Sequence, residues 1–144
     1  MAATRSADVT WRGSLLEGGG TIDRVGSGVL DGQAVSWPAR SEEKSGGKTS
    51  PEELIAAAHA ACFSMALSHG LSQAGTPPEE LHTSAAVTFV PGTGITTIAL
   101  TVRGRVPGLD ADGFRAAAEG VKANCPVSKA LAGVPEITLD AALA

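Results

Sequence analysis

The chain has 144 residues, which is enough for one ordinary domain, so we expect a single domain over residues 1–144. Its 15 acidic residues outnumber its 11 basic ones, and this net charge of -4 argues against a nucleic-acid partner, because phosphate contacts need a basic patch. The 25 alanines and 18 glycines, with no tyrosine, leave few bulky side chains for a core, and an obligate dimer would compensate by burying more surface.

The sequence contains only two cysteines, Cys62 and Cys125. Two cysteines exclude a scaffold held by several disulfides and a four-cysteine zinc site. The first residues, Met1 to Trp11, contain no apolar run typical of a signal peptide, and no stretch reaches the roughly 18 apolar residues that a membrane span needs. We therefore expect a soluble cytoplasmic protein with no membrane partner.

The first 40 residues have the pattern of short strands separated by glycines. Val9 and Trp11 alternate with polar neighbours, and Gly18-Gly19-Gly20 predicts a turn before a strand over Thr21 to Val25. Asp31-Gly32 indicates a hairpin between two further short segments. Residues 41–50 are polar and contain glycine, so they form either a mobile connector or a loop that closes over a site.

A long helix is predicted from residue 51. Ser50 is placed as its N-cap, Pro51 at its first position, and Glu53 completes a capping box with Ser50. From Leu54 to Leu67 the residues are apolar in almost every direction, so the helix is expected to be buried on all sides. Its alanines allow another backbone to approach closely, such as the same helix of a second subunit. Gly75 is expected to end it.

The rest of the chain predicts a hairpin over residues 85–91 and 95–106, with Ile98, Leu100 and Val102 on one face of the second strand. An amphipathic helix follows over residues 110–122, then a short helix over 126–131 and a strand over 136–139. Strands, helix, strands, helices and a strand in this order predict an α+β fold.

The two cysteines differ in their local setting. Cys62 lies in the middle of an apolar helix, where burial raises the pKa of a thiol and makes it unreactive. Cys125 stands where Pro126 opens a helix, and the unpaired N–H groups there favour a thiolate. Local physics alone therefore favours Cys125 as the nucleophile.

His59 and Cys62 lie three residues apart, on one face of the predicted helix. They could form a Cys–His nucleophilic pair, or two metal ligands with Cys125 as the third, although no fourth ligand is evident. His69 and His82 have no ligand at a suitable spacing and are expected at the surface. Glu52 is not needed for capping and requires either solvent or a cation.

Two motifs resemble one known family. Residues 51–68, Pro-Glu-Glu-Leu-Ile-Ala-Ala-Ala-His-Ala-Ala-Cys-Phe-Ser-Met-Ala-Leu-Ser, resemble the central helix of the OsmC branch of the OsmC/Ohr thiol peroxidases, and residues 124–128, Asn-Cys-Pro-Val-Ser, resemble its second cysteine motif. Segments at residues 11–13, 28–30, 106–111 and 136–140 are also similar, so the resemblance covers essentially the whole chain. The resemblance implies antiparallel sheets wrapped around a long buried central helix in an intertwined homodimer.

The resemblance also implies a cysteine peroxidase that reduces organic hydroperoxides, and possibly hydrogen peroxide, in defence against oxidative or osmotic stress. Cys62 matches the peroxidatic cysteine that becomes a sulfenic acid, and Cys125 matches the resolving cysteine that forms a disulfide with it. Arg40 matches the arginine that stabilises the thiolate, and Glu52 the carboxylate that holds this arginine. No metal or bound cofactor is implied, and the reductant is an external dithiol or a lipoyl-type protein.

Helix geometry adds a condition to this site. Glu52 and Cys62 are about 15 Å apart along a continuous helix, too far for one arginine of the same chain to bridge, so we expect a site completed across a dimer interface. Ser41 follows Arg40 where family members tend to have an aromatic residue, and Arg24 and Arg12 are the alternatives to Arg40. A redox-sensing or ligand-binding stress protein without turnover is the alternative function.

Overall fold

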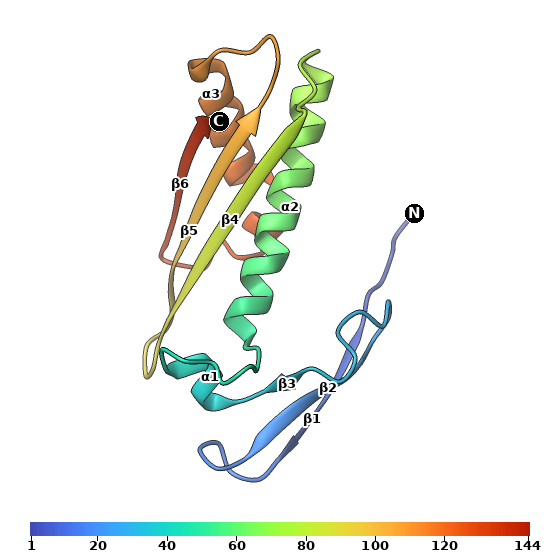
Figure 1. Ribbon diagram of the computed structural model, residues 1–144, viewed down its shortest axis with the longest axis vertical. Helices are drawn as coiled ribbons and strands as arrows, with labels where there is room; N and C mark the ends of the chain where they lie inside the picture. Colours follow the sequence, from blue (N-terminus) through green and yellow to red (C-terminus); the bar gives the residue numbers. More distant parts are fainter. The chain divides into compact units, whose positions relative to one another are not determined.

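The computed structural model describes all residues, Met1–Ala144, and the chain has the predicted α+β fold (Figure 1). It divides into two compact units, Met1–Leu54 and Ile55–Ala144. The first unit contains a small sheet, a short helix and the first turn of a long helix, and the second contains the rest of that helix with a second sheet and two more helices.

The sheet of the first unit has the order β1-β2-β3 and is antiparallel throughout, with the strands β1 (Ala7–Arg12), β2 (Gly19–Val25) and β3 (Ala34–Val35). The strands predicted around Val9 and Trp11 and over Thr21 to Val25 are confirmed, although β2 starts inside the predicted glycine turn. The short segment predicted before Asp31 is wrong, because residues 26–32 form turns. Gly20 lies inside the strand, and its position needs a glycine because a Cβ there would lie 2.7 Å from the Val35 side chain and 2.8 Å from the Trp11 ring. Gly32 has a φ of 82° in the connection from β2 to β3, as the Asp-Gly pair predicts.

A short helix, α1 (Trp37–Ser41), follows β3 and was not predicted from the sequence. The Ser36 hydroxyl caps it by accepting a hydrogen bond from the Ala39 N–H at 3.1 Å. Pro38, in the first turn, needs no hydrogen-bond acceptor for its nitrogen. Ser36, with Pro38 two residues later, was the sequence signal for this helix. The helix places Arg40 in its last turn.

The long helix α2 (Pro51–Gln73) is present at the predicted position. The Ser50 hydroxyl accepts from the Glu53 N–H at 3.2 Å, so the predicted N-cap is confirmed. The Glu53 carboxylate accepts instead from the Thr49 hydroxyl at 2.8 Å, so only half of the capping box forms. Gly75, with a φ of 87°, follows the end of the helix as predicted.

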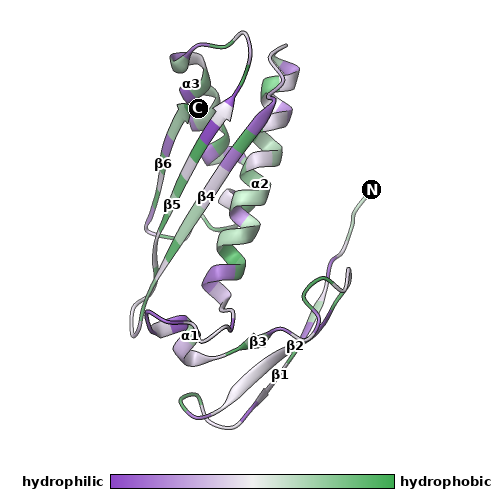
Figure 2. Cartoon of the chain, viewed as in Figure 1, coloured by the Kyte–Doolittle hydropathy of each residue, from purple (hydrophilic) through white to green (hydrophobic).

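One face of α2 is buried and the opposite face is exposed. Four residues at a spacing of four are buried: His59, Phe63, Leu67 and Leu71. Small or apolar residues on the opposite face are exposed: Ala57, Ala58, Ala61 and Met65. In the single chain the helix is therefore not buried on all sides as predicted, although hydrophobic residues occur along much of its length (Figure 2).

By length and composition, α2 could also cross a membrane, and this corrects the expectation that no segment of the chain could. Core helices of soluble proteins meet the same criterion. Phe63, Leu67 and Leu71 of this helix pack into the hydrophobic core of the second unit.

The sheet of the second unit has the order β4-β5-β6, with the strands β4 (Glu80–Val90), β5 (Gly94–Arg105) and β6 (Glu136–Leu143). The predicted hairpin is β4 and β5, which pair antiparallel. β6 pairs with β5 in parallel, so this sheet is mixed rather than antiparallel as expected. A parallel pair needs a crossover, which α3 (Ala111–Asn124) and α4 (Pro126–Ala130) provide.

The core of this unit lies between α2, α3 and one face of the sheet (Figure 1). Ile98, Leu100 and Val102 are buried on the face of β5 that the sequence predicted. They pack with the α2 residues already named and with Phe114 and Ala118 of α3. This packing fixes the part of α2 that carries Cys62 and the chain segment that carries Cys125.

Candidate active site

Cys62 lies on α2 beside the buried Phe63 and is itself half-buried. Burial is the largest influence on its thiol and raises its pKa. The neighbouring Cys125 thiol raises this pKa further, while a hydrogen bond from the Val127 N–H lowers it. The two free cysteines, 63 residues apart in the sequence, are thus close enough for one thiol to influence the pKa of the other.

Cys125 is buried at the N-terminus of α4, where its own sulfur is the N-cap group. Its Sγ accepts from the Ser128 N–H at 3.3 Å and lies 3.1 Å from the Ser128 Oγ. Pro126 at the first position of α4 fixes this turn, because its φ suits a helix start. Two polar groups of Ser128, its N–H and its hydroxyl, therefore lie within hydrogen-bonding distance of the Cys125 sulfur.

His59 faces the same cluster from α2 and is fully buried. Its Nε2 lies 2.7 Å from the Ser128 Oγ, and its Nδ1 has no hydrogen-bond partner. Burial lowers the pKa of this imidazole, so its neutral form is favoured. The structure contains no group of three or more His, Cys, Asp or Glu residues that could hold a metal ion, and His59 bonds to Ser128 instead.

The other two predicted site residues form an ion pair in the first unit. The Arg40 Nε, on α1, donates to the Glu52 Oε1, on the first turn of α2, at 2.9 Å. Glu52 is buried, and its second oxygen, Oε2, has no hydrogen-bond partner. Glu52 thus has a cation as its partner, which is one of the two possibilities that the sequence left open.

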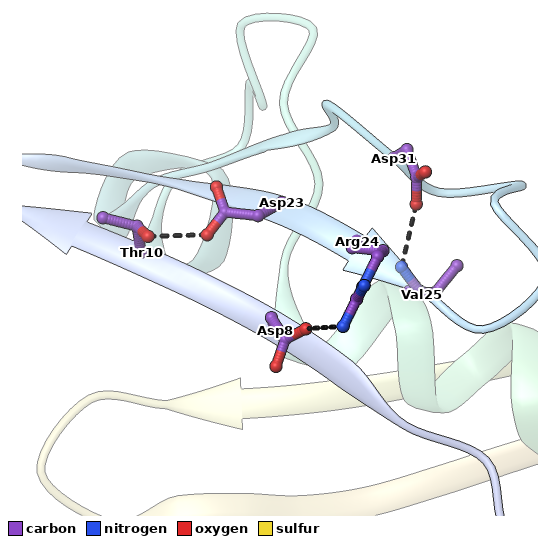
Figure 3. A network of polar contacts seen from close by, with 6 residues as sticks. All are labelled: Asp8, Thr10, Asp23, Arg24, Val25 and Asp31. Carbon is purple, nitrogen blue, oxygen red and sulfur yellow. Dashed lines mark hydrogen bonds and ion pairs between the residues drawn. The ribbon is translucent and has the colours of Figure 1, made fainter.

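The two alternative arginines have other surroundings. Arg24 on β2 pairs with Asp8 on β1 at 3.3 Å across the exposed surface of the first sheet, next to the Thr10–Asp23 hydrogen bond (Figure 3). Arg12, at the end of β1, is exposed. Neither of them has a buried carboxylate as its partner, as Arg40 does.

An apolar groove with a volume of about 570 Å³ lies in the first unit. Its walls come from the small sheet, α1 and the start of α2, and include Val9, Trp11, Ile22, Val35, Trp37 and Leu54. Arg40 also lines the groove and is the charged residue among its walls. Such a surface suits an apolar occupant with a polar end.

The resemblance placed Cys62, Cys125, Arg40 and Glu52 in one site, whereas within this chain the structure pairs Cys62 with Cys125 and Arg40 with Glu52. Sequence reasoning missed Ser128, which joins His59 to Cys125. The signal was its position three residues after an N-cap residue, where the backbone N–H points back at the capping side chain. His69 and His82 are exposed, as predicted.

The chain is similar to known proteins over almost its whole length. The profile of the OsmC-like protein family matches residues 44–140. The Peroxiredoxin OsmC of Escherichia coli (strain K12) is 44% identical over 143 residues, covering 97% of this chain and 96% of that protein.

Two solved structures have a similar fold over nearly their whole length. One is the organic hydroperoxide resistance protein OhrB of Bacillus subtilis (28% identity, TM-score 0.62, 96% of this chain and 98% of that one). The other is an organic hydroperoxide resistance protein from Elizabethkingia anophelis (23% identity, TM-score 0.69, all of both chains). The chain therefore belongs to the OsmC-like protein family.

Proposed function

We propose that this protein is a cysteine-dependent peroxidase that acts in defence against oxidative stress. Its family and the peroxiredoxin name of its 44% identical relative support this activity. The observation that carries the proposal is the position of the Cys125 thiol beside the Cys62 thiol, because a two-cysteine peroxidase must join its two sulfurs.

In the proposed reaction the Cys62 thiolate attacks the distal oxygen of a hydroperoxide. The O–O bond breaks, the alkoxide takes up the proton that the thiol had released and leaves as an alcohol, and Cys62 becomes a sulfenic acid. Cys125 then displaces the hydroxide from this sulfur, giving a disulfide and water. An external dithiol reduces the disulfide and returns both thiols, so no bound metal or organic cofactor takes part.

The first step requires a cation near Cys62. Burial and Cys125 both raise the pKa of this thiol, and the Val127 N–H, which opposes them, carries no full charge. We assign the cation to Arg40, because a guanidinium keeps its proton in apolar surroundings. Glu52 holds Arg40 in place through the 2.9 Å ion pair.

We further propose a homodimer in which Arg40 and Glu52 of one subunit act on Cys62 of the other, each chain being one domain. Glu52 and Cys62 are separated by about 15 Å along α2, which is uninterrupted between them. The exposed Ala57, Ala61 and Met65 on this helix provide an apolar face for a second copy.

Subunit complementation tests the shared site. Co-expressed Cys62→Ser and Arg40→Ala subunits, separated by two affinity tags, form heterodimers with one intact site. We expect the purified heterodimer to have about half of wild-type turnover, since one of its two sites is intact, and the unseparated pool about a quarter, since half of its dimers are hybrid. Inactive heterodimers would place Arg40 and Cys62 of the same chain in one site.

We infer that the substrates are organic hydroperoxides. The groove lined by Arg40 is apolar elsewhere, so it suits a hydroperoxide with a hydrocarbon group better than hydrogen peroxide. The similarity to OhrB of Bacillus subtilis, an organic hydroperoxide resistance protein, agrees with this class. We expect the protein to be soluble and cytoplasmic.

Hydroperoxide consumption with dithiothreitol tests the function in wild type, Cys62→Ser and Cys125→Ser. We expect the wild type to consume one equivalent of cumene hydroperoxide per two thiols and then to turn over with the dithiol. Cys62→Ser should be inactive, and Cys125→Ser should stop at a sulfenic acid. Oxidation without turnover in the wild type would instead indicate a redox sensor.

A further inference from the structure

The cluster of Cys125, Ser128 and His59 contains more polar groups than the proposed reaction has used so far. His59 is fully buried on α2, and Ser128 is buried on α4, yet the two side chains meet at 2.7 Å. Ser128 also lies 3.1 Å from the Cys125 sulfur, so its hydroxyl connects a histidine to a reacting atom. A buried polar chain of this kind constrains the direction of each of its hydrogen bonds.

The direction of the hydrogen bonds from His59 to Ser128 to Cys125 follows from the unpaired Nδ1 of His59. Burial lowers the pKa of the imidazole, and a neutral imidazole carries a proton on only one nitrogen. A buried N–H without an acceptor is rarer than a buried acceptor without a donor. We therefore assign the proton to Nε2, which has a partner, and leave Nδ1 as the unpaired acceptor.

With this tautomer, the His59 Nε2–H donates to the Ser128 Oγ. The one hydroxyl proton of Ser128 is then free to point at its other neighbour, the Cys125 Sγ at 3.1 Å. The Ser128 N–H already points at the same sulfur from 3.3 Å. The Cys125 sulfur thus receives two hydrogen bonds from one residue, and His59 fixes the orientation of one of them.

We propose that Ser128 is a further catalytic residue, which stabilises the Cys125 thiolate in the resolving step, and that His59 is the positioning residue that directs its hydroxyl. This proposal rests on the two-cysteine peroxidase function. Hydrogen bonds to an ionised group are stronger than those to a neutral one, so both donors favour the thiolate over the thiol.

In the resolving step the Cys125 Sγ attacks the sulfur of the Cys62 sulfenic acid. The S–S bond forms, the S–O bond breaks, and the departing hydroxide takes the proton that Cys125 gives up, so water leaves. The Cys62 sulfur is reduced and the Cys125 sulfur oxidised, each to the disulfide level, without another reactant. When a dithiol later attacks the Cys62 sulfur, Cys125 leaves as a thiolate and the same two donors assist it.

Single-turnover kinetics with one equivalent of cumene hydroperoxide separate the two steps. Sulfenic acid is trapped with dimedone, disulfide is counted by mass spectrometry, and folding is checked by thermal melting. In Ser128→Ala the Cys62 sulfenic acid should form and accumulate, with disulfide formation slowed about tenfold or more. Ser64→Ala is the matched control, because the hydrogen bonds of the Ser64 hydroxyl go to Ala60 and Thr83 rather than to a cysteine.

Two further measurements separate hydrogen bonding from packing. His59→Leu should slow disulfide formation, and His59→Gln, whose amide can donate to Ser128, should restore part of the rate. Proton–nitrogen correlation spectra of the wild-type imidazole should show the proton on Nε2, and this readout does not depend on any variant folding.

Disulfide formation at the wild-type rate in a folded Ser128→Ala would overturn the proposal, as would a His59 proton found on Nδ1. These outcomes leave the proposed function intact. If the wild type formed no sulfenic acid at Cys62, the peroxidase function itself would fail.

Discussion

Glu52 is an acidic residue with only 6% of its surface exposed, and only one of its two oxygens has a partner. Arg40 stabilises the negative charge of Glu52 in this buried position. The Arg40 side chain is one-third exposed and donates to the other carboxylate oxygen at 2.9 Å. A carboxylate left alone in a buried site is costly, whereas an amide of the same shape is much less so.

Removing Arg40 should therefore affect both stability and chemistry. We expect Arg40→Ala to lower the free energy of unfolding by about 1–3 kcal/mol, because it leaves the buried Glu52 charge unpaired. Adding Glu52→Gln should recover most of this stability but none of the peroxidase activity. Denaturant unfolding and peroxide assays of the two single variants and the double variant measure both effects.

Arg24→Ala is the control for that cycle. Arg24 pairs with Asp8 on the exposed surface of the first sheet (Figure 3). Exposed pairs contribute about 0–1 kcal/mol, so both stability and activity should stay near those of the wild type. A large loss of activity in Arg24→Ala, with none in Arg40→Ala, would move the catalytic role to Arg24.

The buried His59 makes stability depend on pH. Its pKa in the folded protein is lowered by burial, so below the unfolded value of 6.5 the unfolded chain binds more protons than the folded one. Stability should therefore fall as the pH drops below about 6.5, by at most about 1.4 kcal/mol per pH unit. Thermal melting between pH 5 and 8 should show this slope in the wild type and in His69→Gln, and a flatter one in His59→Gln.

At the scale of the elements, the close packing of β5 on α3 depends on one glycine. A Cβ at Gly104 would lie 2.7 Å from two atoms of the fully buried Phe114 ring. We expect Gly104→Ala to destabilise the protein by about 1–3 kcal/mol through overpacking. Gly120→Ala, on α3 with nothing within 4 Å, should stabilise it by about 0.5–1 kcal/mol. Denaturant unfolding measures both, and a neutral Gly104→Ala would contradict the packing argument.

The elements with strong local signals were predictable from the sequence. Ser50 and Pro51 marked the start of α2, and Ile98, Leu100 and Val102 marked the core face of β5, because capping and alternation act over a few residues. The parallel pairing of β6 with β5 could not be predicted this way, since strand partners are chosen by contacts between distant segments. The resemblance between motifs, rather than local physics, gave the order of the two cysteines.

At the scale of the whole molecule, we expect a dimer because one apolar face of α2 is exposed in the single chain. We expect Ala61→Lys to shift the protein from dimer to monomer in light scattering, because a charge would be buried on the apolar face. Ala116→Lys is the matched control, since Ala116 is exposed on α3. A wild-type monomer at micromolar concentration would contradict both the dimer and the shared site.

The position of Cys125 has a consequence for the motion of the protein. Its sulfur is the N-cap group of α4, and a sulfur in a disulfide accepts hydrogen bonds more weakly than a thiolate. In the proposed cycle, forming the disulfide should therefore loosen the start of this five-residue helix, and reducing it should restore the cap. Amide hydrogen exchange in α4 should be faster in the oxidised protein than in the reduced one, so local flexibility reports the redox state of the chain.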